Sequence, residues 1–214
     1  MKIPIGILPG GSANGMAKEI GIGTDAQKAL DIITTGQVKQ IDLIRINDQL
    51  CIHLGDIGFN AFVVKTFETF DARGMWGYIK AAWKVLWRNR RMEVSISLDD
   101  QFIRRDAAMV VLANASKYGT GAVVNPKGEL DDGLFEVIVM KRMALSEILK
   151  MMITHKPYDP KKVELFQTTS LSIRSKHEVH FQVDGEYLGK VHNVEAGITP
   201  GALYILVPAD AREN

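Results

Sequence analysis

The sequence predicts an α+β chain that is mainly β: an antiparallel β-sandwich or barrel preceded by a short α/β segment. Residues 1–36 combine one strand pattern with helix patterns, whereas short strands separated by turns follow from residue 38 onward. The apolar runs at residues 108–112 and 134–140, the second interrupted only by Glu136, are typical of strands buried on both faces. The change in pattern near Gln37 predicts a boundary between a 1–36 segment and a 37–214 domain.

The composition excludes several classes of protein. The 214 residues contain 26 Lys and Arg against 25 Asp and Glu, a formal net charge of +1, so no general positive field would attract nucleic acid. The longest apolar runs are of strand length, and residues 1–6 enter a strand pattern rather than a signal peptide. Cys51 is the only cysteine, which excludes an internal disulfide and a cysteine-rich zinc site. A reducing, cytoplasmic location is expected.

The first 36 residues are predicted to form a strand, a helical turn and a helix. Residues 3–8 have the pattern of a buried strand, and residues 12–20 form a helical turn begun by a polar cap. Thr24 is the predicted N-cap of the following helix, and Gly36 is predicted to end it. One face of this helix carries three apolar side chains: Ala26, Leu30 and Ile33.

The rest of the chain is predicted to be strands interrupted by three helices. The predicted strands are residues 39–46, 50–54, 92–98, a return strand from Phe102, 108–112, 134–140, 163–168, 171–174, 178–183 and 202–207. The predicted helices are residues 61–70, 76–90 and 145–155. Strands at this spacing favour an antiparallel sandwich or barrel.

Residues 8–15, here called the glycine turn, are the first candidate site. A strand ends at Leu8-Pro9, glycines allow a ligand to approach the backbone, and a helix follows, an arrangement that favours an anion such as phosphate. Ser12 adds a hydroxyl group and Asn14 an amide. The alternative from the residues alone is an ordinary tight turn with a helix cap.

The second candidate is Asp184-Gly185-Glu186, here called the acidic turn. A strand runs into Asp-Gly and out again, which predicts a tight hairpin. The functional alternative is that its two carboxylates supply a general base and a metal ligand at the rim of a sheet.

Two further segments have both a functional and an ordinary interpretation. Residues 126–134 contain acidic side chains and free loop carbonyls that would suit Mg²⁺ or Ca²⁺, but a solvated turn explains the pattern equally well. Residues 80–91 form a basic helix with Trp83 and Trp87 on one face. This pattern is typical of a membrane-surface segment and also of an ordinary amphipathic helix.

Taken in order, five segments resemble motifs of the diacylglycerol kinase catalytic family, which includes bacterial lipid kinases and sphingosine kinases. Pro9-Gly10-Gly11-Ser12-Ala13-Asn14 is similar to the family's Pro-x-Gly-Thr/Ser-x-Asn, and residues 55–61 resemble its Gly-x-Gly-Phe-Asp-Ala. Residues 113–121 resemble its Asn-x-x-x-Tyr-Gly-Gly-Gly, residues 131–134 its Asp-Gly-Leu, and the acidic turn its Asp-Gly-Glu. The resemblance implies the C-terminal β-sandwich lobe of this fold, preceded by a remnant of the α/β nucleotide lobe.

The resemblance also implies an activity. ATP would bind between the two lobes at Gly10, Gly11, Ser12 and Asn14, and Glu186 or Asp184 would deprotonate a lipid hydroxyl for attack on the γ-phosphate. Asp132, with backbone oxygens of Glu129 and Leu134, would hold a structural Mg²⁺. The expected acceptor is diacylglycerol or a related lipid, met at a membrane surface by peripheral association.

The chain departs from the family pattern at two places. It contains no Gly-Gly-Asp-Gly-Thr motif, and Asn60 stands where the family has Asp. We therefore expect a truncated kinase that is weak or inactive by itself, with apolar surface exposed around residues 3–8 and 26–33 that packs on the sandwich or on a second copy as a homodimer. A non-catalytic β-sandwich that binds lipid or a protein partner is the alternative; a hydrolase using Asp184 and Glu186 has less support.

Overall fold

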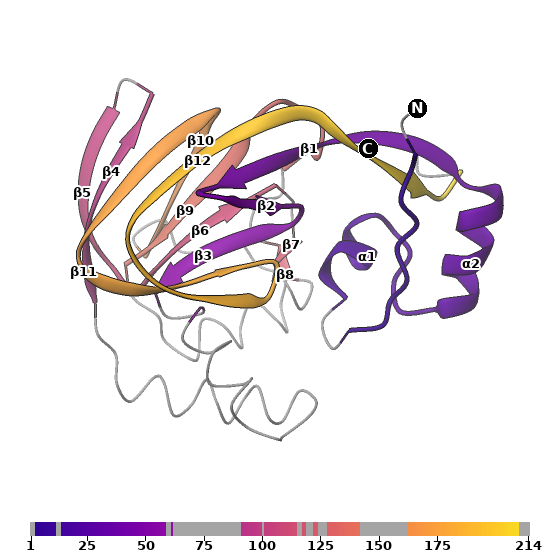
Figure 1. Cartoon of the computed structure of the whole chain (residues 1–214), viewed down its shortest axis with the longest axis horizontal. Helices are drawn as coiled ribbons and strands as arrows, with labels where there is room; N and C mark the ends of the chain where they lie inside the picture. Colours follow the sequence, from indigo (N-terminus) through magenta and orange to yellow (C-terminus); the bar gives the residue numbers. More distant parts are fainter. Residues whose placement is uncertain are drawn as a thin grey trace, which may run out of the picture.

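The computed structural model describes residues 3–11, 14–58, 61, 91–99, 101–114, 117–118, 122–123, 128–141 and 162–209. Ser12, Asn60 and, apart from Ala61, the predicted helices at 61–70, 76–90 and 145–155 lie outside the described residues. Figure 1 shows strands curved around one core and two helices at one end, where the described part of the chain also begins and ends. No helix within the described ranges is long and apolar enough to cross a membrane.

Two helices, α1 (Gly15–Glu19) and α2 (Ala26–Thr35), pack near the ends of strands β1 and β12. Asp25 caps α2, not Thr24 as predicted, because its Oδ1 accepts the N–H groups of Gln27 at 2.9 Å and Lys28 at 3.2 Å. Gly36 ends α2, as predicted. The small core beneath these helices contains Ala17, Ile20, Ile22, Ala29, Ile32, Ile41, Leu130, Ile205 and Val207.

The predicted strand at residues 3–8 is only a single bridge in the structure. Ile5 pairs in parallel with Ile205: its N–H donates to Tyr204 O at 2.8 Å, and Leu206 N–H donates to its carbonyl at 3.0 Å. Helix α2 buries Ala29 and Ile32 and leaves the predicted apolar face open. As expected, apolar side chains around both segments are exposed: Ile3, Ile5, Leu8, Leu30 and Ile33.

Twelve strands are present within the described residues. They are β1 (Gln37–Ile46), β2 (Gln49–Cys51), β3 (Leu54–Gly58), β4 (Met92–Leu98), β5 (Gln101–Ala107), β6 (Met109–Ala113), β7 (Lys117–Tyr118), β8 (Ala122–Val123), β9 (Phe135–Met140), β10 (Val163–Thr168), β11 (Ser170–Val183) and β12 (Glu186–Val207). The main sheet has the order β10-β9-β6-β3-β11-β12-β1-β2, and β5-β4 branches from β11; β7 and β8 pair with each other. All named strand pairs are antiparallel, and the predicted mainly-β fold is confirmed.

The long strand β11 divides the sheet into the two layers of a sandwich. Its first half pairs with β4 and its last residues with β3, while β12 pairs along both parts. Apolar side chains from both layers form the main core. An ion pair joins the edge strands β5 and β10: Nε of Arg105, on β5, lies 2.7 Å from Oε2 of Glu164, on β10.

Three strand predictions differ from the structure. Residues 50–54 are not one strand, because the N–H groups of Ile52, His53 and Leu54 donate to Asp184 instead of to a neighbouring strand. The predicted strands at 171–174 and 178–183 are one strand with an irregular register between them. Strand β12 begins at Glu186, long before the predicted strand at 202–207, because it pairs with β11 and then with β1.

Candidate functional site

The acidic turn is the tight two-residue hairpin that the Asp-Gly pair predicts. Asp184 and Gly185 have φ angles of 49° and 92°, and Val183 pairs with Glu186 across the turn. Positive φ at both central residues is typical of a type I′ turn, which glycine and aspartate tolerate. The turn therefore places Asp184 at its tip and Glu186 at the start of β12.

The Asp184 carboxylate anchors this turn to the segment that joins β2 to β3. Its Oδ2 accepts the N–H of Ile52 at 2.8 Å, and its Oδ1 accepts those of His53 at 2.9 Å and Leu54 at 3.0 Å. The N–H of Asp184 donates in turn to Leu54 O at 2.8 Å. Both carboxylate oxygens of Asp184 are thus engaged by backbone donors. The side chain of Glu186 is exposed and makes no hydrogen bond or ion pair within the described residues.

Cys51 lies beside this anchor, with Sγ 3.6 Å from Oδ1 of Asp184. Burial raises the pKa of the Cys51 thiol well above its ordinary value, and the charge of Asp184 raises it further. The thiol therefore stays protonated and packs in the main core. Cys51 is therefore a core residue rather than a candidate nucleophile.

The glycine turn is closed by its own asparagine. Asn14 Oδ1 accepts the N–H of Gly11 at 2.8 Å, and Gly10 N–H donates to Leu8 O at 2.9 Å. Asn14 precedes α1 but its side chain makes no hydrogen bond to the helix. A Cβ atom added at Gly10 would meet no atom of the described residues within 4 Å, its chain neighbours aside. Open space beside the Gly10 backbone therefore remains for a ligand.

His53 connects the glycine turn to the acidic turn. A Cβ atom on Gly15 would lie 2.7 Å from Cε1 of His53, so the imidazole packs directly against the Gly15 backbone. The same residue, only 8% exposed, donates its backbone N–H to Asp184. In Figure 1 the hairpin between β11 and β12 ends on the side that faces α1. The glycine turn and the acidic turn therefore lie at one corner of the molecule.

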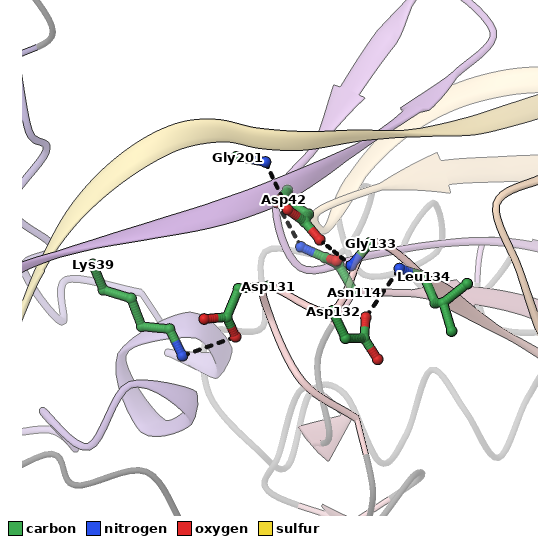
Figure 2. Close-up of polar contacts among 8 residues, drawn as sticks. All are labelled: Lys39, Asp42, Asn114, Asp131, Asp132, Gly133, Leu134 and Gly201. Atoms are coloured by element: carbon green, nitrogen blue, oxygen red, sulfur yellow. Dashed lines mark hydrogen bonds and ion pairs between the residues drawn. The ribbon is translucent and has the colours of Figure 1, made fainter.

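The acidic loop, residues 128–134, is held by buried Asp42 (Figure 2). The Asp42 carboxylate is 2% exposed; its Oδ2 accepts Gly133 N–H at 2.7 Å and its Oδ1 accepts Gly201 N–H at 2.6 Å. The N–H of Asp42 donates to Leu130 O at 2.8 Å, and Asn114 Nδ2 donates to the Asp42 carbonyl at 2.7 Å. The loop is thereby fixed to β1 through Asp42, which Gly201 of β12 and Asn114, directly after β6, also bind.

The acidic loop has the donor chemistry of a site for a hard cation. Asp132 Oδ1 accepts the N–H of Leu134 at 2.9 Å, while its other oxygen has no partner among the described residues. Asn114 Oδ1 is buried and also accepts no hydrogen bond within the part of the chain described. Glu129 is exposed, and Asp131 pairs with Lys39 at 3.1 Å. Oxygen ligands of this kind fit Mg²⁺.

No group of three or more His, Cys, Asp or Glu side chains in the described ranges could hold a metal ion. The predicted magnesium set of Glu129, Asp132 and Leu134 is of another kind, because it uses one side chain and two backbone oxygens. The three residues lie in the same loop, whose conformation Asp42 stabilises.

Sequence reasoning missed four residues that organise this corner: Asp42, His53, Asp56 and Gln182. All four are polar side chains at most 8% exposed. Asp42 and Asp56 are single carboxylates inside apolar strand patterns, which is a detectable signal because a buried charge needs partners. Their partners could not be found from the pattern, since those partners lie far away in the sequence.

Comparisons with known proteins agree with the fold and the order of the motifs. Residues 56–207 match the YegS C-terminal NAD kinase beta sandwich-like domain, and residues 1–46 match the diacylglycerol kinase catalytic domain. A diacylglycerol kinase of Staphylococcus saprophyticus is 26% identical over 196 residues, covering 87% of this chain and 63% of that protein. A "Probable lipid kinase YegS" of Salmonella newport is 27% identical over 212 residues, covering 96% of this chain and 69% of that protein.

Solved structures share the fold. A diacylglycerol kinase from Bacillus anthracis aligns with a TM-score of 0.66 at 18% identity, over 94% of this chain and 65% of that one. A second structure from the same organism has a TM-score of 0.76 at 20% identity, over 94% and 68% of the two chains. The chain spans 63% of the length of its staphylococcal relative. Because one family match covers well over half of the residues, the chain belongs to the family of diacylglycerol kinases and YegS-like lipid kinases.

Proposed function

We propose that this chain is the β-sandwich lobe, with residues 1–36 as a remnant of the nucleotide lobe, of an ATP-dependent lipid kinase. Its acceptor would be the hydroxyl of diacylglycerol or a related lipid. The contact that carries the proposal is His53, which packs on Gly15 of the glycine turn and donates to Asp184 of the acidic turn. A phosphate donor bound at the first turn would thus face carboxylates at the second.

Glu186 is the proposed general base, and Asp184 positions it. The Glu186 side chain is exposed and has no described partner, whereas the Asp184 oxygens are engaged by three backbone N–H groups. The Glu186 carboxylate would take the proton of the lipid hydroxyl while the oxygen of that hydroxyl bonds to the γ-phosphorus. The bond between the γ-phosphorus and the β–γ bridging oxygen breaks, and ADP leaves with the electron pair of that bond. The proton on Glu186 then passes to solvent.

Gly10, Gly11, Ser12 and Asn14 are the proposed contacts to ATP. The open space beside Gly10 supports this assignment, because a phosphate could approach the backbone there. Asp132, with the carbonyls of Glu129 and Leu134, would hold the Mg²⁺. In that loop a bound cation would supply positive charge that stabilises the local fold.

The 214 residues alone are proposed to transfer phosphate weakly or not at all, because the sequence contains no Gly-Gly-Asp-Gly-Thr segment. Phosphoryl transfer depends on aligned donors around the phosphates. A suitable test protein, here called the fused protein, joins this chain to the part of the staphylococcal relative that lies outside the match.

The test measures transfer of γ-phosphate from ATP to diacylglycerol and to sphingosine. The fused protein should phosphorylate a lipid, and the chain alone should be much slower. Glu186→Gln should lower kcat of the fused protein by about 10²–10⁴. Glu195→Gln, another exposed glutamate of β12, is the matched control and should have no effect. An unchanged rate in Glu186→Gln would remove Glu186 as the base.

A non-catalytic binding function is the second candidate. The exposed apolar side chains of Ile3, Leu8 and Leu30 favour it, because such surface is typical of an interface. Binding to anionic lipid vesicles that is independent of ATP, together with no phosphate transfer by the fused protein, would support this function instead.

A further inference from the structure

We infer that Gln182 is a positioning residue for the acidic turn and that the buried carboxylate of Asp56 holds it in place. The effect of Gln182 on phosphate transfer rests on the proposed function. The hydrogen bond between Gln182 and Asp56 is independent of that function.

Gln182 and Asp56 face each other across neighbouring strands in the interior. Asp56 of β3 is the register partner of Gln182 of β11, and each is 1% exposed. Gln182 Nε2 donates to Asp56 Oδ2, and Asp56 Oδ1 accepts the N–H of Ala61 at 2.8 Å. Gln182 Oε1 accepts the N–H of Gly185 at 2.8 Å. One amide therefore joins a buried carboxylate to the centre of the turn.

Both ends of the Gln182 amide are used, so its orientation is determined. Rotating the amide by half a turn would place N–H₂ against the Gly185 N–H and oxygen against the Asp56 carboxylate. Each contact would then be repulsive, and buried polar groups without partners are costly. Asp56 thus sets the direction of the amide, and the amide sets the position of Gly185.

This contact acts on a part of the turn that Asp184 does not reach. Asp184 binds the β2–β3 segment with its side chain. Gln182 instead binds the N–H of Gly185, the residue directly before Glu186. An apolar pair could fill the same space without the cost of burying a charge. The polar pair adds a defined direction, which fixes where the Glu186 backbone leaves the turn.

The test exchanges the hydrogen-bonding pattern of the pair. Gln182→Met keeps the volume and removes both bonds. Asp56→Asn leaves a single oxygen at position 56, and we expect the backbone N–H of Ala61 to keep it. The new N–H₂ then faces the Gln182 N–H₂, and the Gln182 amide can relieve this only by rotating and giving up the Gly185 N–H. The double variant combines Asp56→Asn with Gln182→Glu, so the amide now lies at position 56 and the carboxylate at position 182. The amide at position 56 would donate to one oxygen of the carboxylate at position 182, and the other oxygen would accept the Gly185 N–H. Gln167→Met is the matched control, because Gln167 Nε2 likewise donates to a buried carboxylate, Glu136, at 3.1 Å, on β10 and β9.

Amide hydrogen exchange at Gly185, measured by NMR, is the readout for the full chain. Exchange should become about tenfold faster in Gln182→Met and Asp56→Asn, since one hydrogen bond is lost. It should return close to the parent rate in the double variant and stay unchanged in Gln167→Met. No greater change than in Gln167→Met, or no recovery in the double variant, would overturn the inference. If Gln182→Met does not fold, Asp56→Asn with and without Gln182→Glu decides it.

The fused protein separates this inference from the proposed function. Gln182→Met should lower its kcat about tenfold or more with an unchanged KM for ATP. Hydrogen exchange at Gly185 in the Gln182 and Asp56 variants tests the positioning of the turn. The kcat of Glu186→Gln tests Glu186 as the base. The two can therefore fail separately.

Discussion

The N–H of His53 donates to Oδ1 of Asp184 at 2.9 Å, joining residues 131 positions apart in the sequence. The imidazole of the same His53 packs on Gly15, at the start of α1. His53, between β2 and β3, thus contacts both the glycine turn and the acidic turn.

Asp184 should contribute to stability and Glu186 should not. Asp184→Ala leaves the N–H groups of Ile52, His53 and Leu54 without their acceptor, which should lower the free energy of unfolding by about 1–3 kcal/mol. Glu186→Gln should change it by less than about 0.5 kcal/mol. Urea denaturation of both variants measures this difference. A larger loss in Glu186→Gln would contradict the anchoring role of Asp184.

Gly15 and Gly10 should respond differently to the same substitution. Gly15→Ala would place Cβ 2.7 Å from Cε1 of His53, which should lower stability by about 1–3 kcal/mol because the ring must move. In Gly10→Ala the added Cβ meets no atom of the described residues within 4 Å, and stability should be unchanged. The substitution should weaken binding of ATP·Mg²⁺ about tenfold, measured by calorimetry on the fused protein. Unchanged binding would exclude Gly10 as a nucleotide contact.

Asp42 should be the main support of the acidic loop. Asp42→Asn turns an N–H₂ group toward Gly133 or Gly201 and should cost about 1–3 kcal/mol of folding free energy. Mg²⁺ should also stabilise this variant less than the parent chain in thermal unfolding. Asp131→Asn, which removes an exposed pair with Lys39, is the control and should cost less than about 1 kcal/mol. Equal losses in the two variants would contradict this assignment.

Glu164 should make stability depend on pH in the acid range. Burial alone would raise the pKa of Glu164, but hydrogen bonds from Lys141 and Arg105 outweigh it and lower the pKa below 4.5. The folded chain thus binds this proton less tightly than the unfolded chain. The resulting stabilisation is present above about pH 4.5 and is lost as the pH falls through the folded pKa. The difference in unfolding free energy between parent and Glu164→Gln should shrink as the pH falls below about 4.5; a constant difference would contradict it.

The exposed face of α2 should mediate self-association. Leu30 and Ile33 are 49% and 39% exposed there, and burying such side chains in a second copy would be favourable. We expect the chain to form a homodimer in sedimentation equilibrium and Leu30→Glu with Ile33→Glu to be monomeric. Leu50→Glu, at an exposed leucine of β2, should remain dimeric. A monomeric parent chain would contradict this expectation.

Much of the fold follows from local patterns. Alternation in residues 92–98 and the apolar run at 134–140, interrupted only by Glu136, predict β4 and β9, since strands bury every second or every side chain. The Asp184-Gly185 pair predicts its hairpin, because both residues tolerate positive φ. The break at Ile52 and His53 could not be predicted from such patterns, since the acceptor of their N–H groups is remote in the sequence.

By itself the sequence determined the mainly-β class, the turns and the segments in which chemistry is concentrated, because periodicity and turn residues act over a few positions. Only the tertiary structure decided the roles within those segments. It engaged the Asp184 carboxylate with backbone donors and left Glu186 exposed. It also brought Gln182 against Asp56 and Asp42 against Gly133. The physical reason is that a buried polar group must find its partner in space, wherever the folded chain places one.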